Sequence, residues 1–253
     1  MRRMSKVKGR TPFGDMRLWI IQDNDYSELR TANGCDKFLD LPATITDAEE
    51  IKKLAKMIGI PEEHIYHFHA SNKKDLNKYY TDLKKEYQRL LKDMDNVFLL
   101  VYCSGHGVSS NSKQVYVLNQ SSDATFNIEY KLRLLSDKFD NFCHIFAIYD
   151  VCNTDLSTLP ELCAVRGKAE VMDLNVTSGD SSDPQDCPYF HISAARPGGV
   201  AAADGGFAAK CLKFAVNEAK KDPQGLIEFP RAWASKFRQV QDPGRPYWLQ
   251  LVS

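Results

Sequence analysis

The feature that most restricts the fold is a pair of short segments that are apolar almost from end to end, NVFLLVYC at 96–103 and CHIFAIYD at 143–150. Strands with one face in water alternate apolar and polar residues, whereas strands that are buried on both faces do not. Neither segment approaches the roughly 20 residues of a membrane-spanning helix. The two segments therefore predict central strands of a parallel sheet.

Further strands and helices alternate along the chain. Apolar runs of strand length lie at 16–22, 64–69, 114–118, 189–194 and 247–252. Apolar residues recur every three or four positions, as in helices, at 47–58, 76–91, 128–135, 207–219 and 230–240. The first helix is predicted to begin at Asp47, because TDAE at 46–49 has the spacing of a capping box. This order predicts an α/β fold with a mostly parallel sheet flanked by helices on both faces.

The 253 residues suit a single domain of this kind. Composition divides it into a basic tail at 1–14, a large part at 15–154, a connection at 155–188 rich in Ser, Asp, Gly and Pro, and a smaller part at 189–253. The connection is predicted to run over the surface.

Charge and cysteine usage restrict the partners and the compartment. Lys plus Arg and Asp plus Glu both total 33, so the net charge favours no nucleic-acid partner. Seven cysteines, none in a C-x-x-C pair, and no apolar leader after Met1 predict a reducing compartment, and we expect the cytoplasm. No apolar run is long enough to predict a membrane span.

Unusual residues follow both central strands, as SGHG at 104–107 and DVCN at 150–153. The carboxyl ends of neighbouring parallel strands meet at one edge of a sheet, so we expect His106 and Cys152 to lie together there. An imidazole can lower the pKa of a thiol and later return a proton to a departing amine. The amides of Gly107 and Cys152 could stabilise an oxyanion.

Each half of this motif has a simpler interpretation when it is taken alone. A histidine between glycines is more often a turn residue, and a cysteine at the end of an apolar strand is more often part of the core. The two motifs together favour the catalytic interpretation, with His106 and Cys152 as a dyad.

VYCSGHG and IYDVC resemble the histidine and cysteine motifs of the caspase-like peptidases, and are most similar to those of metacaspases and paracaspases. WIIQDNDYSEL, TDAEEIKKLAKMIGI and HISAARPGGVAAADGGFAAKCL resemble other parts of the same family, over about 15–220. The resemblance implies a caspase-like fold and cysteine endopeptidase activity. The Q-A-C-x-G signature of true caspases is absent.

The resemblance also implies an acidic pocket for a basic residue before the cut, and its aspartates correspond to Asp47 and Asp150. Two carboxylates can bind a guanidinium through charge-assisted hydrogen bonds. Asp47 alone would be read as a first-turn acid that complements the helix dipole. Pro197-Gly198-Gly199 stands where relatives often carry a further acid, and Asn153 follows the cysteine in place of their histidine or arginine.

Metal and cofactor signals are weak. His67 and His69 share one face of a predicted strand, without an identifiable third ligand. Asp180, Asp183 and Asp186 could attract calcium, which activates many metacaspases, but they lack an EF-hand pattern and suit a solvated connection. Phosphate-binding glycine motifs are absent. We expect no required cofactor, no metal in the site, and calcium activation as an open question.

These observations predict an endopeptidase that cleaves proteins or peptides after Arg or Lys through an acyl-enzyme on Cys152. Arg166 and Lys168, in the connection, match that preference and are candidates for self-cleavage. The alternative is a non-catalytic, caspase-homologous interaction module. The sequence leaves a homodimer open.

Overall fold

The computed structural model describes residues 13–34, 36–93, 96–110, 113–152, 154–155, 189–194, 217 and 250–252. The basic tail, the connection and the helices predicted at 207–219 and 230–240 lie almost wholly outside these residues. The parts of the chain that carry the predicted dyad and both aspartates lie within them.

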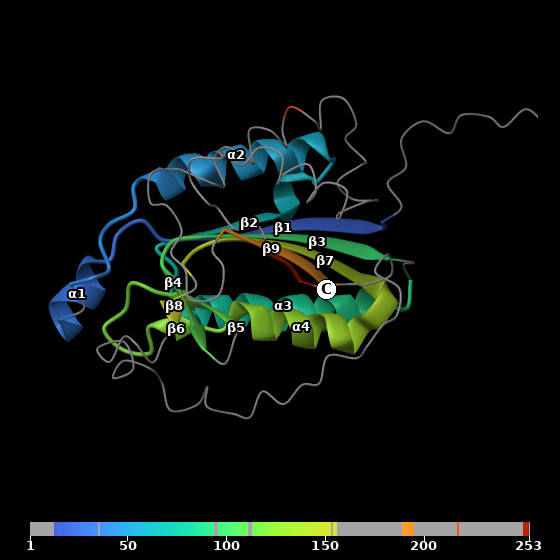
Figure 1. Cartoon of the computed structure of the whole chain (residues 1–253). Helices are drawn as coiled ribbons and strands as arrows, with labels where there is room; N and C mark the ends of the chain where they lie inside the picture. Colours follow the sequence, from blue (N-terminus) through green and yellow to red (C-terminus); the bar gives the residue numbers. More distant parts are fainter. Residues whose placement is uncertain are drawn as a thin grey trace, which may run out of the picture.

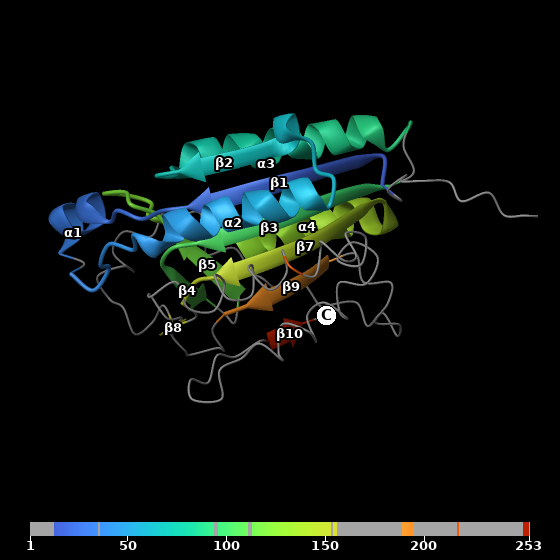
Figure 2. The same ribbon diagram turned by 90° about the horizontal axis from the view of Figure 1, so that it is seen from above.

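The centre of the molecule is a six-stranded sheet in the order β10-β9-β7-β3-β1-β2 (Figures 1 and 2). Its strands are β1 (Asp15–Gln22), β2 (Ile65–His69), β3 (Val97–Ser104), β7 (Cys143–Asp150), β9 (Tyr189–Ser193) and β10 (Gln250–Val252). All neighbouring pairs are parallel except β10 with β9. The mostly parallel sheet that the sequence predicts is confirmed.

Helices cover both faces of this sheet, as predicted (Figure 1). The helix α2 (Ala43–Met57) lies on one face, and α3 (Lys73–Leu90) and α4 (Ile128–Phe139) lie on the other. The short α1 (Ser27–Asn33) lies beyond the carboxyl end of β1. Single 3-10 turns, Glu62–His64 and Asp140–Phe142, precede β2 and β7.

Every residue of β3 is buried, and its side chains divide between the two faces by the two-residue period of a strand. One set packs in the core beneath α3 and α4, namely Val97, Leu99, Val101 and Cys103. Phe98, Leu100 and Tyr102 therefore face the side of α2. Cys103 is thus a core residue, in agreement with the buried central strand predicted at 96–103.

A smaller sheet, in the order β6-β5-β4-β8, lies near the carboxyl ends of the central strands (Figure 1). It consists of β4 (Gly107–Ser110), β5 (Lys113–Val117), β6 (Thr125–Phe126) and β8 (Thr154–Asp155). It packs with α1 around a second core, formed by Tyr26, Leu29, Phe38, Val108, Val115, Val117 and Ala124. This second core supports the segment that contains His106.

The predicted start of the first helix is wrong. The helix α2 begins at Ala43, one turn before Asp47, with Pro42 at its N-cap position already in helical conformation. Thr44 accepts a hydrogen bond from Gln22 and donates one to the carbonyl of Leu41, so tertiary contacts fix the first turn. Asp47 is consequently an internal helix residue with only 2% of its surface exposed.

Within the described part of the chain, no helix combines the length and the apolar character needed to cross a bilayer.

Candidate active site

The pairing of β3 with β7 determines how the two predicted motifs meet. Ser104 lies beside Asp150 at the last position of the pairing, so 105–106 and 151–152 leave the sheet side by side. The segments that follow pair again, because Val108 of β4 lies beside Thr154 of β8 in parallel. The histidine and cysteine segments are thus held together before and after the predicted dyad.

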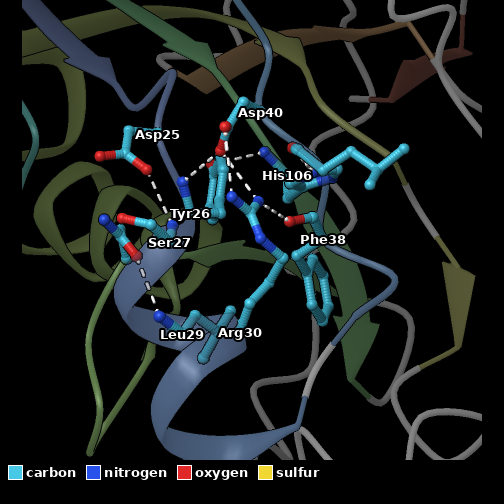
Figure 3. Close-up of polar contacts among 10 residues, drawn as sticks. Asp25, Tyr26, Ser27, Leu29, Arg30, Phe38, Asp40 and His106 are labelled. Atoms are coloured by element: carbon cyan, nitrogen blue, oxygen red, sulfur yellow. Dashed lines mark hydrogen bonds and ion pairs between the residues drawn. The ribbon is translucent and has the colours of Figure 1, made fainter.

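The side chain of His106 is held in one position against the loop before α2 (Figure 3). Its Nε2 atom lies 2.7 Å from the carbonyl oxygen of Leu39, and a carbonyl can only accept, so Nε2 carries a proton. The ring packs edge to face against Tyr26 and Phe38, with centroid distances of 4.5 and 5.0 Å. This arrangement leaves Nδ1 as the ring nitrogen that can exchange a proton.

The hydroxyl of Tyr26 is inserted at the point where β4 and β5 begin to pair. The amide of Val117 donates to the carbonyl of His106 at 3.0 Å. The reciprocal bond is replaced by a bridge, in which the amide of His106 donates to the Tyr26 hydroxyl at 2.8 Å and this hydroxyl donates to the carbonyl of Val117 at 3.3 Å. Tyr26 therefore fixes both the ring and the backbone of His106.

Close approach of other groups explains both glycines that flank His106, namely the backbone of Cys152 at Gly107 and tyrosine hydroxyls at Gly105. A Cβ atom at Gly107 would lie 2.6 Å from the carbonyl oxygen of Cys152, and one at Gly105 would lie 2.6 Å from the Tyr26 hydroxyl. Hydrogen-bonded and non-hydrogen-bonded positions alternate along an antiparallel pair. His106 is hydrogen-bonded to Val117, so Gly107, the next residue, lies at a non-bonded position and its amide points away from β5. It points toward the side on which Cys152 lies.

Burial separates the two thiols nearest to the site. Cys103 is fully buried, and burial raises the pKa of its thiol far above the usual range. Cys152 is partly exposed. Burial lowers the pKa of His106, and the hydrogen bond to Leu39 partly offsets this effect, so the site favours the neutral imidazole. A neutral imidazole can accept a proton from a thiol.

The two predicted pocket acids converge from different elements. Asp150, at the end of β7, shares the α2 side of the sheet with Tyr102, and Asp47 is buried in α2. The Asp150 residue keeps some exposed surface, but its carboxyl group is desolvated. This desolvation and the negative charge of Asp47 raise the pKa of Asp150 to about 8, against a smaller opposing effect of Tyr102.

Other residues singled out in the sequence have different positions. His67 bonds through Nε2 to the side chain of Gln22 at 2.9 Å, and burial lowers its pKa to about 4. No cluster of three or more metal-ligating side chains occurs among the described residues. The calcium candidates Asp180, Asp183 and Asp186, the cleavage candidates Arg166 and Lys168, and Asn153 and 197–199 lie outside them.

Two features of the site carry no signal in the sequence. The acceptor for His106 is a main-chain carbonyl, which any residue at position 39 supplies. Tyr26 lies 80 positions before His106, and its place in the site depends on the tertiary fold.

A family model for the caspase domain matches residues 18–232. The chain belongs to the caspase domain family. Two solved structures share the fold of this caspase-domain protein. A protein from Geobacter sulfurreducens has a TM-score of 0.60 and 13% identity over 94% of this chain and 93% of its own. Caspase-1 from Spodoptera frugiperda has a TM-score of 0.55 and 14% identity over 94% and 84%. No curated protein matches the sequence.

The predicted caspase-like fold is therefore confirmed, and membership supports a cysteine-peptidase function in general. At 13–14% identity the two structures establish the fold alone. The closer likeness to metacaspases and paracaspases stays a prediction, as do the roles of His106, Cys152, Gly107, Asp47 and Asp150.

We predict that Tyr26→Phe lowers the free energy of unfolding by about 1–3 kcal/mol, because it leaves the buried amide of His106 and the carbonyl of Val117 without their bridge. Tyr87→Phe is the matched control, since Tyr87 is equally buried and its hydroxyl has no hydrogen-bond partner among the described residues. Urea denaturation of both variants measures the difference. Equal stability of the two variants would contradict the bridging role.

Proposed function

We propose that this caspase-domain protein is a cysteine endopeptidase that hydrolyses peptide bonds after Arg or Lys. The observation that carries the proposal is the set of contacts that fixes the ring and the backbone of His106. Its Nε2–H is engaged by the carbonyl of Leu39, its Nδ1 is left for proton exchange, and its flanking backbone lies against that of Cys152. A turn histidine with no chemical task requires none of these constraints.

In the proposed reaction, the Cys152 thiol gives its proton to Nδ1 of His106, and the thiolate attacks the carbonyl carbon of the scissile bond. The amides of Gly107 and Cys152 stabilise the negative oxygen that forms. The tetrahedral species collapses as His106 returns the proton to the departing amine, which leaves a thioester. Water, activated by the same imidazole, then hydrolyses the thioester and restores the thiol.

Asp47 and Asp150 form the proposed recognition site for the basic side chain. Burial and the neighbouring charge make the ionised pair unfavourable when the pocket is empty, which is why the pKa of Asp150 rises. A guanidinium or ammonium placed between the carboxyls removes this repulsion and supplies hydrogen bonds. The pocket therefore favours a cation over a neutral side chain and over Asp.

We predict that Cys152→Ala and His106→Ala abolish cleavage of arginyl peptides and leave folding almost unchanged. Cys103→Ala is expected to keep measurable activity, because the deeply buried thiol of Cys103 remains protonated. Labelling with arginyl and aspartyl electrophilic peptides, followed by peptide mapping, tests nucleophile and preference together.

The expected result is arginyl labelling at Cys152. A folded wild-type protein that reacts with neither peptide would instead support an interaction module, and near wild-type hydrolysis by Cys152→Ala would exclude the proposed mechanism.

We predict that Asp150→Asn weakens transition-state binding of arginyl substrates by about 2–5 kcal/mol, as when one partner of a buried charge pair is removed. In the wild type, Asp150 becomes charged as pH rises through about 8. The ratio of kcat/KM for an arginyl peptide to that for its neutral citrullinyl counterpart should therefore rise over the same range. Asp150→Asn should show a flat ratio.

Stability provides the control for this variant. The folded-state pKa of Asp150 lies above its unfolded value, so its contribution to stability falls as pH rises from the ordinary carboxyl range through about 8. Asp150→Asn should therefore be at least as stable as wild type at pH about 8 in thermal unfolding. A flat ratio in the wild-type protein would refute the pocket assignment.

We predict self-cleavage after Arg166 or Lys168, because both match the proposed preference and lie in the connection between the two parts. Purified protein would be incubated and new N-termini mapped by mass spectrometry, with Cys152→Ala as the control. An intact chain in a sample that turns over substrate would show that cleavage is not the activating step.

A further inference from the structure

The position of the Leu39 carbonyl decides which nitrogen of His106 carries the proton, so the loop that presents this carbonyl is part of the chemistry. Leu39 itself is 65% exposed, and its side chain is therefore not what anchors the loop. The anchoring contacts must come from its neighbours in the chain. This inference rests on the proposed function of His106.

Arg30 binds the loop through Phe38 and Asp40, the residues before and after position 39 (Figure 3). The Nη1 atom of Arg30, on α1, donates to the carbonyl of Phe38 at 2.7 Å and to Oδ1 of Asp40 at 2.9 Å. Its Nη2 atom donates to the second oxygen of Asp40 at 3.2 Å. The planar guanidinium thus ties the residue before Leu39 to the residue after it.

Asp40 connects the contacts of Arg30 to Tyr26 and so to His106. Its Oδ1 atom also accepts a hydrogen bond from the amide of Tyr26 at 2.9 Å, at the N-cap position of α1. Tyr26 in turn holds the ring and the amide of His106. Arg30, Asp40 and Tyr26 therefore form a continuous set of contacts that begins and ends at the imidazole.

Stability alone is a poor explanation for the pair. The side chains of Arg30 and Asp40 are 25% and 51% exposed, and exposed ion pairs contribute little to folding. Bidentate geometry, in contrast, fixes orientation, and a lysine ammonium cannot reproduce it. The contacts of Arg30 with Phe38 and Asp40 fix the position of the residue between them, and with it the Leu39 carbonyl.

We propose that Arg30 and Asp40 are positioning residues for His106, which hold the loop so that the Leu39 carbonyl selects the Nε2–H tautomer and leaves Nδ1 to act on Cys152. Without the contacts of Arg30 with Phe38 and Asp40, the loop no longer holds the Leu39 carbonyl in place, and the imidazole exchanges between its two tautomers. Only one tautomer can accept the proton of the thiol in the proposed geometry.

The charges of the pair give a second signature. The groups that affect the pKa of the imidazole are the Leu39 carbonyl and Asp40 of the loop and Arg30 of α1, while the ring of Tyr26 packs against it and Cys152 is its proposed partner. Arg30 lowers the pKa of His106 and Asp40 raises it. Asp40→Asn removes a charge that raises the pKa of His106 and also frees the Leu39 carbonyl, whose hydrogen bond raises it as well, so both effects of this variant should lower the pKa.

The test combines kinetics with long-range proton–nitrogen NMR of the imidazole in wild type, Arg30→Met, Arg30→Lys and Asp40→Asn. Lys78→Ala is the matched control, because Lys78 and Asp82 form an exposed ion pair on α3, remote from His106. Wild type and Lys78→Ala should show the Nε2–H tautomer. Arg30→Met should show a mixture and a kcat lower by about ten- to hundredfold at similar KM, with Arg30→Lys intermediate.

A pure Nε2–H tautomer in Arg30→Met would overturn the inference, whatever its rate. Should Arg30→Met fail to fold, the tautomer of Arg30→Lys decides in the same way. Absence of peptide cleavage by the wild-type protein would count against the proposed function, while the tautomer measurement, which needs no substrate, would still decide the role of Arg30.

Discussion

The pairing of β3 with β7 is the interaction on which the rest of the site depends. Both strands are buried on the face of α2 and on the face of α3 and α4, so their register cannot slip without exposing apolar side chains. The register ends with Ser104 beside Asp150. It therefore fixes, at the same time, where the histidine segment leaves the sheet, where the cysteine segment leaves it, and where Asp150, the proposed pocket acid, lies.

The second core, formed around α1 and the smaller sheet, provides the surroundings of the His106 side chain. Tyr26 and Phe38 belong to it, and their rings are also the walls around His106. Packing against these rings orients the imidazole, and the same burial lowers its pKa. The imidazole itself makes its polar contact with a main-chain carbonyl, that of Leu39. A small apolar cluster at the edge of the main sheet is thus as important to the proposed chemistry as the dyad itself.

Much of the fold could be predicted because its central strands carry an unmistakable pattern. The run at 143–150 coincides with β7, and the long amphipathic repeat coincides with α3. The start of α2 was mispredicted, since contacts of Thr44 with Gln22 and Leu41 outweigh the local capping signal. The helix α1 lacks such a pattern because it is short and two amides at its start bond to distant side chains, Asp40 and Asn119, beside one local bond from Ser27 to Asp25. The proposed dyad and pocket acids have signals in their residue types, whereas the Leu39 carbonyl has none.

Because a main-chain carbonyl holds His106, the sequence at position 39 can evolve with little constraint from this contact. Substitution at position 39 leaves the acceptor in place, so this part of the machinery is insensitive to most codon changes there. The exposed side chain of Leu39 is then free to diversify without loss of the imidazole's anchor. Proline is the exception, because the Leu39 amide donates to the carbonyl of Lys37, and proline has no amide proton to give.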